Sequence, residues 1–160
     1  MAYASRILSS TITRPNDTTA YAAGDLVAND TTAGNVTPFS WDLSGAASGC
    51  RVRQVNVIKS AAGVTNASFR VWLFNASKAV TNGDNGAIAP TTMASFIGSL
   101  TGSASLGGTA GAVCQCVADV GEIWPGKAGT LYALLEARGA YTPGAQETFQ
   151  LELVLADESR

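Results

Sequence analysis

The sequence contains no histidine, and this absence removes several classes of chemistry at once. Histidine is the commonest general base in enzymes and the commonest metal ligand in proteins. A Ser-His-Asp or Cys-His mechanism is therefore excluded within this chain. We expect a protein that is not an enzyme, with no catalytic residues and no cofactor-binding residues.

Charge is also scarce. Asp, Glu, Lys and Arg make up 14% of the 160 residues, against roughly a quarter in an average soluble domain. The formal net charge of −2 gives no field that would attract nucleic acid or an anionic membrane, so we expect neither as a partner. A neutral surface of small residues is instead cheap to bury against another protein, because interface centres are depleted in charge.

Long apolar runs are missing as well. The longest, such as residues 131–135, fall far short of the roughly 20 residues that cross a bilayer as a helix. Residues 1–10 do not combine a basic segment with a long apolar one, as a secretory signal would. We expect no membrane association and synthesis in a cytoplasm.

Three cysteines are present, an odd number. Cys114 and Cys116 are two residues apart, which on a strand places both side chains on one face. A metal site would need further ligands, and only Cys50 could supply another thiolate. We expect three reduced, structural cysteines and no bound metal.

What the sequence does contain is period-two alternation of apolar and polar residues along nearly its whole length, which is typical of β-strands. It predicts an all-β, antiparallel domain of about eight or nine short strands with long small-residue loops, spaced as in two-sheet β-sandwiches. The expected strands are 3–13, 21–28, 39–43, 50–59, 68–75, 96–100, 112–120, 130–138 and 147–156. We expect one domain over residues 1–160, with an extended N-terminal arm at about 1–10.

Four local features refine this prediction. Strands 50–59 and 68–75 read as a hairpin, and 130–138 with 147–156 as a closing pair. Val52 and Val55 cannot share one face of a regular strand, which indicates a bulge near Arg53 and Gln54. Strand 68–75 is apolar on both faces, so both should be covered. Residues 131–138 could alternatively form a short helix.

Two loops rich in small residues are expected at 76–90 and 101–111, the second being mobile or ordering on contact. Residues 82–86 (NGDNG) have the oxygen-rich composition of a calcium loop, but they lack the spacing and closing glutamate of an EF-hand. We interpret them as a plain turn, because Asn, Asp and Gly tolerate positive φ.

Carboxylates and aromatic residues offer two weaker candidate sites. Asp119 and Glu122 flank a predicted turn, and Glu136 and Glu152 fall on what could be neighbouring strands. A glycosidase needs such a pair across a cleft, but we expect these side chains to face solvent. The aromatic residues could stack on sugars, although packing in a core or subunit interface is the commoner role. They are Trp41, Trp72, Trp124, Tyr21, Tyr132 and Tyr141.

Several stretches, in order along most of the chain, resemble small structural proteins of tailed-phage virions, of the capsid decoration or cement type. They are ITRPNDTTAYAAGDLV at 12–27, FRVWLF at 69–74, LYALLEAR at 131–138, YTP at 141–143 and ETF at 147–149. The resemblance implies a β-sandwich or jelly roll that binds the major capsid protein on the capsid surface, often as a homotrimer at lattice three-folds. It assigns no role to individual residues.

Within that interpretation we expect lattice contacts from residues 1–6, 76–90 and 101–111, because these segments are small and polar. A tail or fibre component with a carbohydrate-binding module is the alternative, and it predicts an exposed aromatic platform. A glycoside hydrolase or lyase is a further alternative, and it predicts a cleft with paired carboxylates.

Overall fold

The computed structural model describes residues 5–45, 49–108, 111–118, 123–125 and 129–157. This part of the chain forms nine strands and one 3-10 turn at Ala33–Asn35, so the all-β prediction and its strand count are confirmed. The strands are β1 (Ser5–Thr13), β2 (Leu26–Val27), β3 (Phe39–Asp42), β4 (Cys50–Lys59), β5 (Ser68–Phe74), β6 (Phe96–Gly108), β7 (Gly111–Ala118), β8 (Thr130–Ala137) and β9 (Thr148–Asp157).

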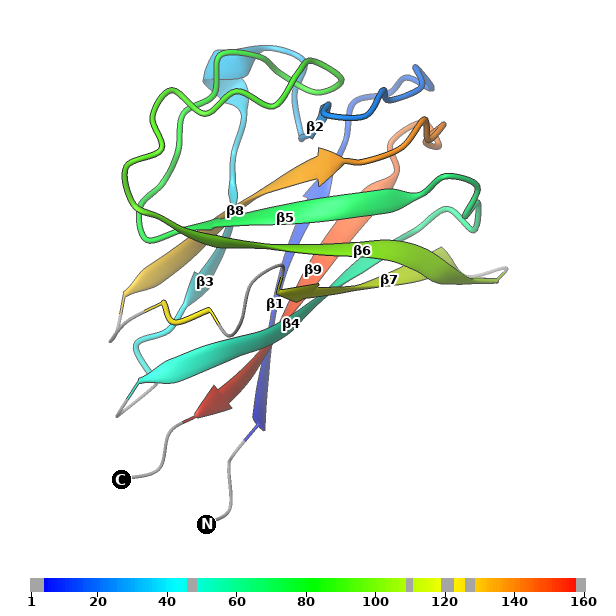
Figure 1. Ribbon diagram of the computed structural model, residues 1–160. Coiled ribbons are helices and arrows are strands. Elements are labelled where there is room, and N and C mark those ends of the chain that lie inside the picture. Colours follow the sequence, from blue (N-terminus) through cyan, green and yellow to red (C-terminus); the bar gives the residue numbers. More distant parts are fainter. Residues whose placement is uncertain (1–4, 46–48, 109–110, 119–122, 126–128, 158–160) are drawn as a thin grey trace.

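All nine strands belong to one antiparallel sheet, which curls around the core as a half-barrel (Figure 1). The order is β1-β9-β4-β7-β6-β5-β8-β2, and β3 also pairs with β8. The curl brings Phe69 of β5 against Phe149 of β9, with ring centroids 5.7 Å apart. It also brings β3 near β1, where the amide N of Ser40 donates to Oγ of Ser10 at 3.1 Å.

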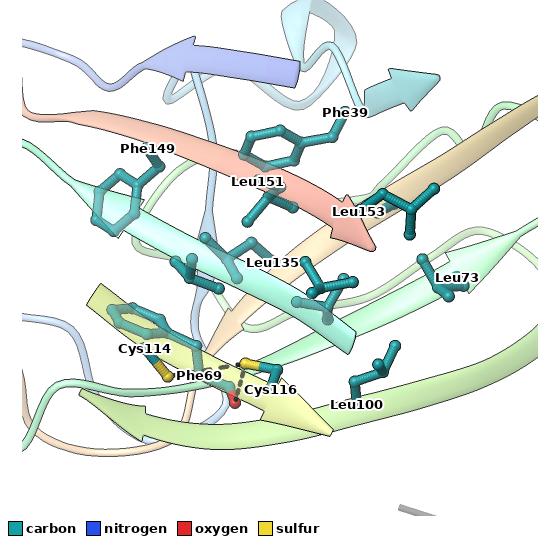
Figure 2. Close-up of a cluster of buried hydrophobic side chains, with 14 of the residues drawn as sticks. Phe39, Phe69, Leu73, Leu100, Cys114, Cys116, Leu135, Phe149, Leu151 and Leu153 are labelled. Carbon is teal, nitrogen blue, oxygen red and sulfur yellow. Dashed lines mark hydrogen bonds between the residues drawn. The ribbon is translucent and has the colours of Figure 1, made fainter. Parts of the chain in front are cut away.

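The core lies on the inner face of the sheet, because each central strand turns alternate apolar residues inward. On β9 the residues Phe149, Leu151, Leu153 and Leu155 are all buried, as the alternation predicts. Figure 2 shows Phe149, Leu151 and Leu153 packed among residues from β3, β5, β6, β7 and β8. One hydrophobic cluster therefore joins strands from both ends of the chain.

β5 and β8 carry a second, smaller cluster on their outer face, which confirms that both faces of β5 are covered. Its buried members are Leu26, Ala28, Phe74, Val80 and Leu134. Val80 belongs to the segment between β5 and β6, so this long loop covers the outer face of β5 and β8.

Two predicted strand pairings are wrong. β4 pairs with β7 and β9, and β5 pairs with β6 and β8, so these strands do not form a hairpin. β8 pairs with β2, β3 and β5, and β9 pairs with β1 and β4, so they are not a closing pair. Alternation determines which face a residue occupies and carries no information on which strand lies beside it.

The predicted bulge is confirmed, because the β4–β9 register shifts between Val52 and Gln54. Val52 and Val55 are both fully buried as a result. The extra residue lets the two valines share the inner face.

Two further predictions need correction. Residues 101–108 are not a mobile loop but most of β6. The strand predicted at 130–138 is confirmed as β8, and its helical alternative is not formed. Residues 5–10 of the predicted arm pair with β9 in β1, and residues 1–4 lie outside the described residues. Glycine in β6 reflects crowding rather than mobility, since a Cβ on Gly102 would lie 2.0 Å from the carbonyl oxygen of Gln115.

Candidate interaction surface

Charged side chains occupy inward positions at one end of the sheet, away from the two termini (Figure 1). Each lies two residues from a buried apolar residue and therefore on the same face of its strand. Arg14 comes two residues after Ile12 of β1, Lys59 two residues after Val57 of β4, and Glu147 two residues before Phe149 of β9. All three are buried. A buried charge is costly unless it is paired and hydrogen-bonded, so the partners of these groups decide what they do.

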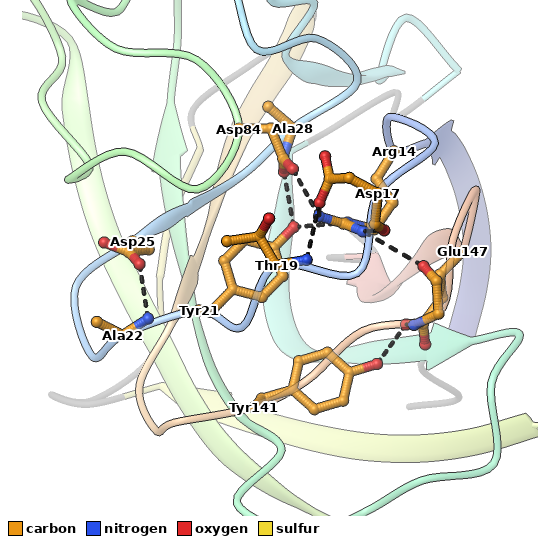
Figure 3. A network of polar contacts seen from close by, with 11 residues as sticks. Arg14, Asp17, Thr19, Tyr21, Ala22, Asp25, Ala28, Asp84, Tyr141 and Glu147 are labelled. Carbon is orange, nitrogen blue, oxygen red and sulfur yellow. Dashed lines mark hydrogen bonds and ion pairs between the residues drawn. The ribbon is translucent and has the colours of Figure 1, made fainter.

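Arg14 is paired with Asp84, which comes from the long loop between β5 and β6 (Figure 3). Arg14 Nη2 lies 2.9 Å from Asp84 Oδ2, and Arg14 Nε donates to the Tyr21 hydroxyl at 2.9 Å. That hydroxyl donates to Asp84 Oδ1 at 2.6 Å, and the amide N of Ala28 donates to the same oxygen at 2.8 Å. Burial, followed by the charge of Asp84, raises the pKa of Tyr21 well above its ordinary range, which keeps it a donor. Burial also raises the pKa of Asp84, against the opposing effect of these donors.

Lys59 is paired with Glu147 at 3.0 Å. Glu147 also accepts hydrogen bonds from the Tyr141 hydroxyl and, at 2.9 Å, from the amide N of Gly144. Burial, followed by the bond to Glu147, raises the pKa of Tyr141 well above its ordinary range. The rings of Tyr21 and Tyr141 stack with centroids 6.2 Å apart and planes within 9°. The two stacked rings therefore connect the ion pair at Asp84 with the ion pair at Glu147.

We call the six residues Arg14, Lys59, Tyr21, Asp84, Tyr141 and Glu147 the polar clasp. All six side chains are buried, and each ionisable group bonds to another member of the clasp. A substrate would have to break these bonds to reach any of the six side chains, so the clasp is not suited to catalysis. Its bonds fix three loops to the sheet, the β1–β2, β5–β6 and β8–β9 loops, which contribute Tyr21, Asp84 and Tyr141.

Gly83 places Asp84 in the clasp. A Cβ at this position would lie 2.0 Å from the carbonyl oxygen of Thr31. We predict that Gly83→Ala lowers the free energy of unfolding by about 1–3 kcal/mol through overpacking. Gly63→Ala is the matched control, because a Cβ there meets nothing within 4 Å. Equal urea midpoints for the two variants would contradict the prediction.

Residues 82–86, whose composition resembles that of a calcium loop, form a turn in which Asn85 has a φ of 62°. The same turn places Asp84 beside Arg14. Sequence reasoning treated Asp84 as an ordinary turn residue and missed its pairing with Arg14. An available signal was the alternation of β1, which places Arg14 at an inward position and so requires a buried anion.

The candidate pair of Glu136 and Glu152 does not come together in the structure. Glu136 is on β8 and Glu152 is on β9, and four strands lie between them in the sheet. Glu136 is also not solvent-facing, since it is buried and accepts hydrogen bonds from Trp72 Nε1 at 2.7 Å and Arg138 Nη1 at 2.8 Å. Asp119 and Glu122 lie outside the described residues.

The aromatic candidates divide into two groups. Trp41, Tyr21 and Tyr141 are buried, as expected for core packing, and Trp72 and Tyr132 are half-buried. Trp124 is 46% exposed, with the guanidinium of Arg51 5.1 Å from its ring centroid. Only Trp124, among these six, presents a largely open ring.

Cys114 and Cys116 lie side by side on the inner face of β7, as the sequence predicts, with Sγ atoms 3.7 Å apart (Figure 2). They and Cys50 are buried, reduced cysteines. The hydrogen bond between the two sulfur atoms lowers the pKa of the Cys114 thiol. Within the described ranges, no three His, Cys, Asp or Glu residues are grouped so that they could hold a metal.

The surface with most potential for interaction is the outer face of β1, β9, β4 and β7, which we call the open face. Its outward residues are Ile7, Ser9, Thr11, Gln150, Glu152, Val154, Gln54, Asn56, Ile58, Val113, Gln115 and Val117. Glu152 is the single charged residue among these twelve, while Arg51, opposite Ala156, and the exposed Arg53 at the bulge lie beyond them on β4. Ile7 and Val117 are 62% and 57% exposed, so apolar groups sit on both outer strands of a face that has few charges.

No helix in the described part of the chain is long and apolar enough to span a membrane. Comparison with protein-family models and with curated proteins finds no match to this chain.

Proposed function

We propose that this chain is a non-enzymatic structural protein of a tailed-phage virion that binds the major capsid protein and copies of itself on the capsid surface, after synthesis in the host cytoplasm. The observation that carries the assembly function is the open face, whose twelve central outward residues include one charge, with Arg51 and Arg53 beyond them on β4. Such a face loses little hydration energy when another protein covers it. The virion assignment rests on the sequence stretches that resemble decoration proteins, which also imply a homotrimer at lattice three-folds.

The fold is compatible with the jelly-roll-like β-sandwich that the resemblance implies. The contact between Phe69 of β5 and Phe149 of β9 places the two halves of the curled sheet face to face. We propose that these halves correspond to the two layers of a sandwich.

Absence of enzyme activity is part of the same proposal. The buried ionisable groups of the polar clasp bond to one another, and Glu136 is held by Trp72 and Arg138. These bonds hold the groups within the fold, where they stabilise it.

For the capsid contact we propose the segment that follows the loop at 76–90, where Met93 and Phe96 are 47% and 37% exposed. The loop itself is held by Asp84, so this segment is presented without a large loss of conformational entropy on binding. Contacts of modest strength suffice when they are repeated over a symmetric lattice.

The test is co-sedimentation of the purified protein with empty capsid shells of a tailed phage. We expect wild type and the control Val64→Glu to sediment with the shells, and Met93→Glu to lose at least ten-fold in affinity. Val64 is a suitable control because it is 37% exposed in the separate loop between β4 and β5. Equal binding by all three proteins would refute the proposed contact, and no binding by wild type would refute the capsid function.

A carbohydrate-binding tail or fibre component is the alternative, and the open ring of Trp124 favours it. Glycan-array binding that is lost in Trp124→Ala, from a protein that does not sediment with shells, would establish this alternative.

A further inference from the structure

The open face contains a cross-strand row that is apolar at both ends. Ile7 of β1 is opposite Val154 of β9, Val154 is opposite Gln54 of β4, and Gln54 is opposite Val117 of β7. The row therefore has apolar residues at both ends, one on each outer strand of the face. The next row reads Ser9, Glu152, Asn56 and Gln115 in the same strand order.

We propose that two copies of this chain stack through their open faces, related by a two-fold axis that runs along the strands between β9 and β4. This contact rests on the self-binding part of the proposed function, and it can be tested without capsid shells. The axis exchanges β1 with β7 and β9 with β4 while keeping each row opposite itself. Ile7 then lies over Val117 of the second copy, and Val154 lies over Gln54 of the second copy. An isologous contact requires such self-complementarity.

The charges support this axis. Glu152 falls over Asn56 of the second copy, an amide that already donates to a Glu152 carboxylate within one chain at 3.4 Å. Arg51 is opposite Ala156 on β9, so it falls over Ala156 of the second copy. No like charges oppose one another among these positions. A two-fold axis across the strands would instead place the Glu152 carboxylate on Val154 and leave Ile7 over Ser9.

The size of the face sets the strength of the contact. Four strands about 4.8 Å apart and three rows spaced by two residues give a flat extent of roughly 20 Å by 20 Å. A stable interface covers about 800 Å² of each partner, so this contact is small. It should form reversibly at high protein concentration. On a lattice it would join copies across two-fold positions and add to binding at three-folds.

The test compares solution masses by light scattering and sedimentation at about 100 μM to 1 mM, a range suited to weak contacts. The two variants are Ile7→Glu and Val117→Lys. When two copies of the same variant pair, each new charge faces an apolar residue of the other copy. We expect each alone to have a lower average mass than wild type at the same concentration, with at least a ten-fold loss in self-affinity. Both sites are exposed, so folding should be retained, and circular dichroism checks this.

Mixing the two variants gives the discriminating result. In the mixed pair Glu at position 7 faces Lys at position 117, while the second contact is the unaltered Ile7 with Val117. We expect the mixture to regain the wild-type mass, and Val64→Glu to keep it throughout. Equal masses for wild type and both single variants would overturn the proposal, and so would a mixture that stays at the mass of the variants. Neither outcome bears on shell binding, which depends on Met93.

Discussion

Asp84→Asn should lower the free energy of unfolding by about 3–5 kcal/mol, because it leaves the buried Arg14 guanidinium without its main counter-charge. The amide also retains one acceptor oxygen where the carboxylate serves Arg14, Tyr21 and the amide N of Ala28. Since domains are stable by about 5–15 kcal/mol, this single change would consume a large part of the total. Urea unfolding followed by tryptophan fluorescence measures it.

A matched control is Asp42→Asn, because Asp42 caps a surface turn through the amide N of Ser44 and is not buried. We expect a much smaller shift of the urea midpoint for this variant. Adding Arg14→Met to Asp84→Asn should cost less than the sum of the single changes, since the unpaired buried charge is then gone. Equal midpoints for Asp84→Asn and Asp42→Asn would show that the clasp does not stabilise the fold.

The protein should unfold steeply in alkali, between about pH 10 and 12, because Tyr21 and Tyr141 ionise far more easily in the unfolded chain. Burial raises the pKa of both phenols, with Asp84 adding to it for Tyr21 and Glu147 for Tyr141. Above an unfolded-state pKa of about 10, the unfolded chain binds fewer protons than the native one, so stability falls as pH rises. Each tyrosine contributes about 1.4 kcal/mol per pH unit, or about 5 kcal/mol for the pair over two units.

Urea titrations at several alkaline pH values, with phenolate absorbance as the second readout, measure this slope. Tyr21→Phe and Tyr141→Phe should each remove about half of the tyrosine contribution, whatever their effect on stability at neutral pH. A double Phe variant whose stability falls with pH as steeply as that of wild type would contradict the assignment.

How far the sequence could predict this structure depends on whether a property is local. The inward orientation of alternate residues from Phe149 to Leu155 and the bulge before Val55 both follow from alternation within one strand. Both predictions are confirmed. The partner of each strand is not local. β4 and β5 are consecutive and both apolar, yet β4 pairs with β7 and β9 while β5 pairs with β6 and β8. Side-chain periodicity leaves the neighbour of each strand undetermined.

Small residues gave a misleading signal at 101–108. A stretch of Gly, Ser and Ala lacks the bulk that predicts a strand, but in β6 the close approach of Gln115 requires a residue as small as Gly102. The clasp was beyond local patterns for a related reason. Arg14 and Asp84 are 70 residues apart, and nothing near either one identifies the other.

The position of β9 has a consequence for how the chain acquires its fold. β9 lies between the edge strand β1 and β4, so the strand that a ribosome makes last of the nine is inserted between two others rather than added at the edge of the sheet. Until β9 is made, β1 and β4 lack the strand that pairs with both of them. The contacts that complete the core then join segments separated by most of the sequence. Pairing between distant segments slows folding, and apolar surface and unpaired strand edges exposed meanwhile favour aggregation. Expression conditions that slow synthesis or supply a chaperone should therefore raise the yield of native protein more than changes to the surface would.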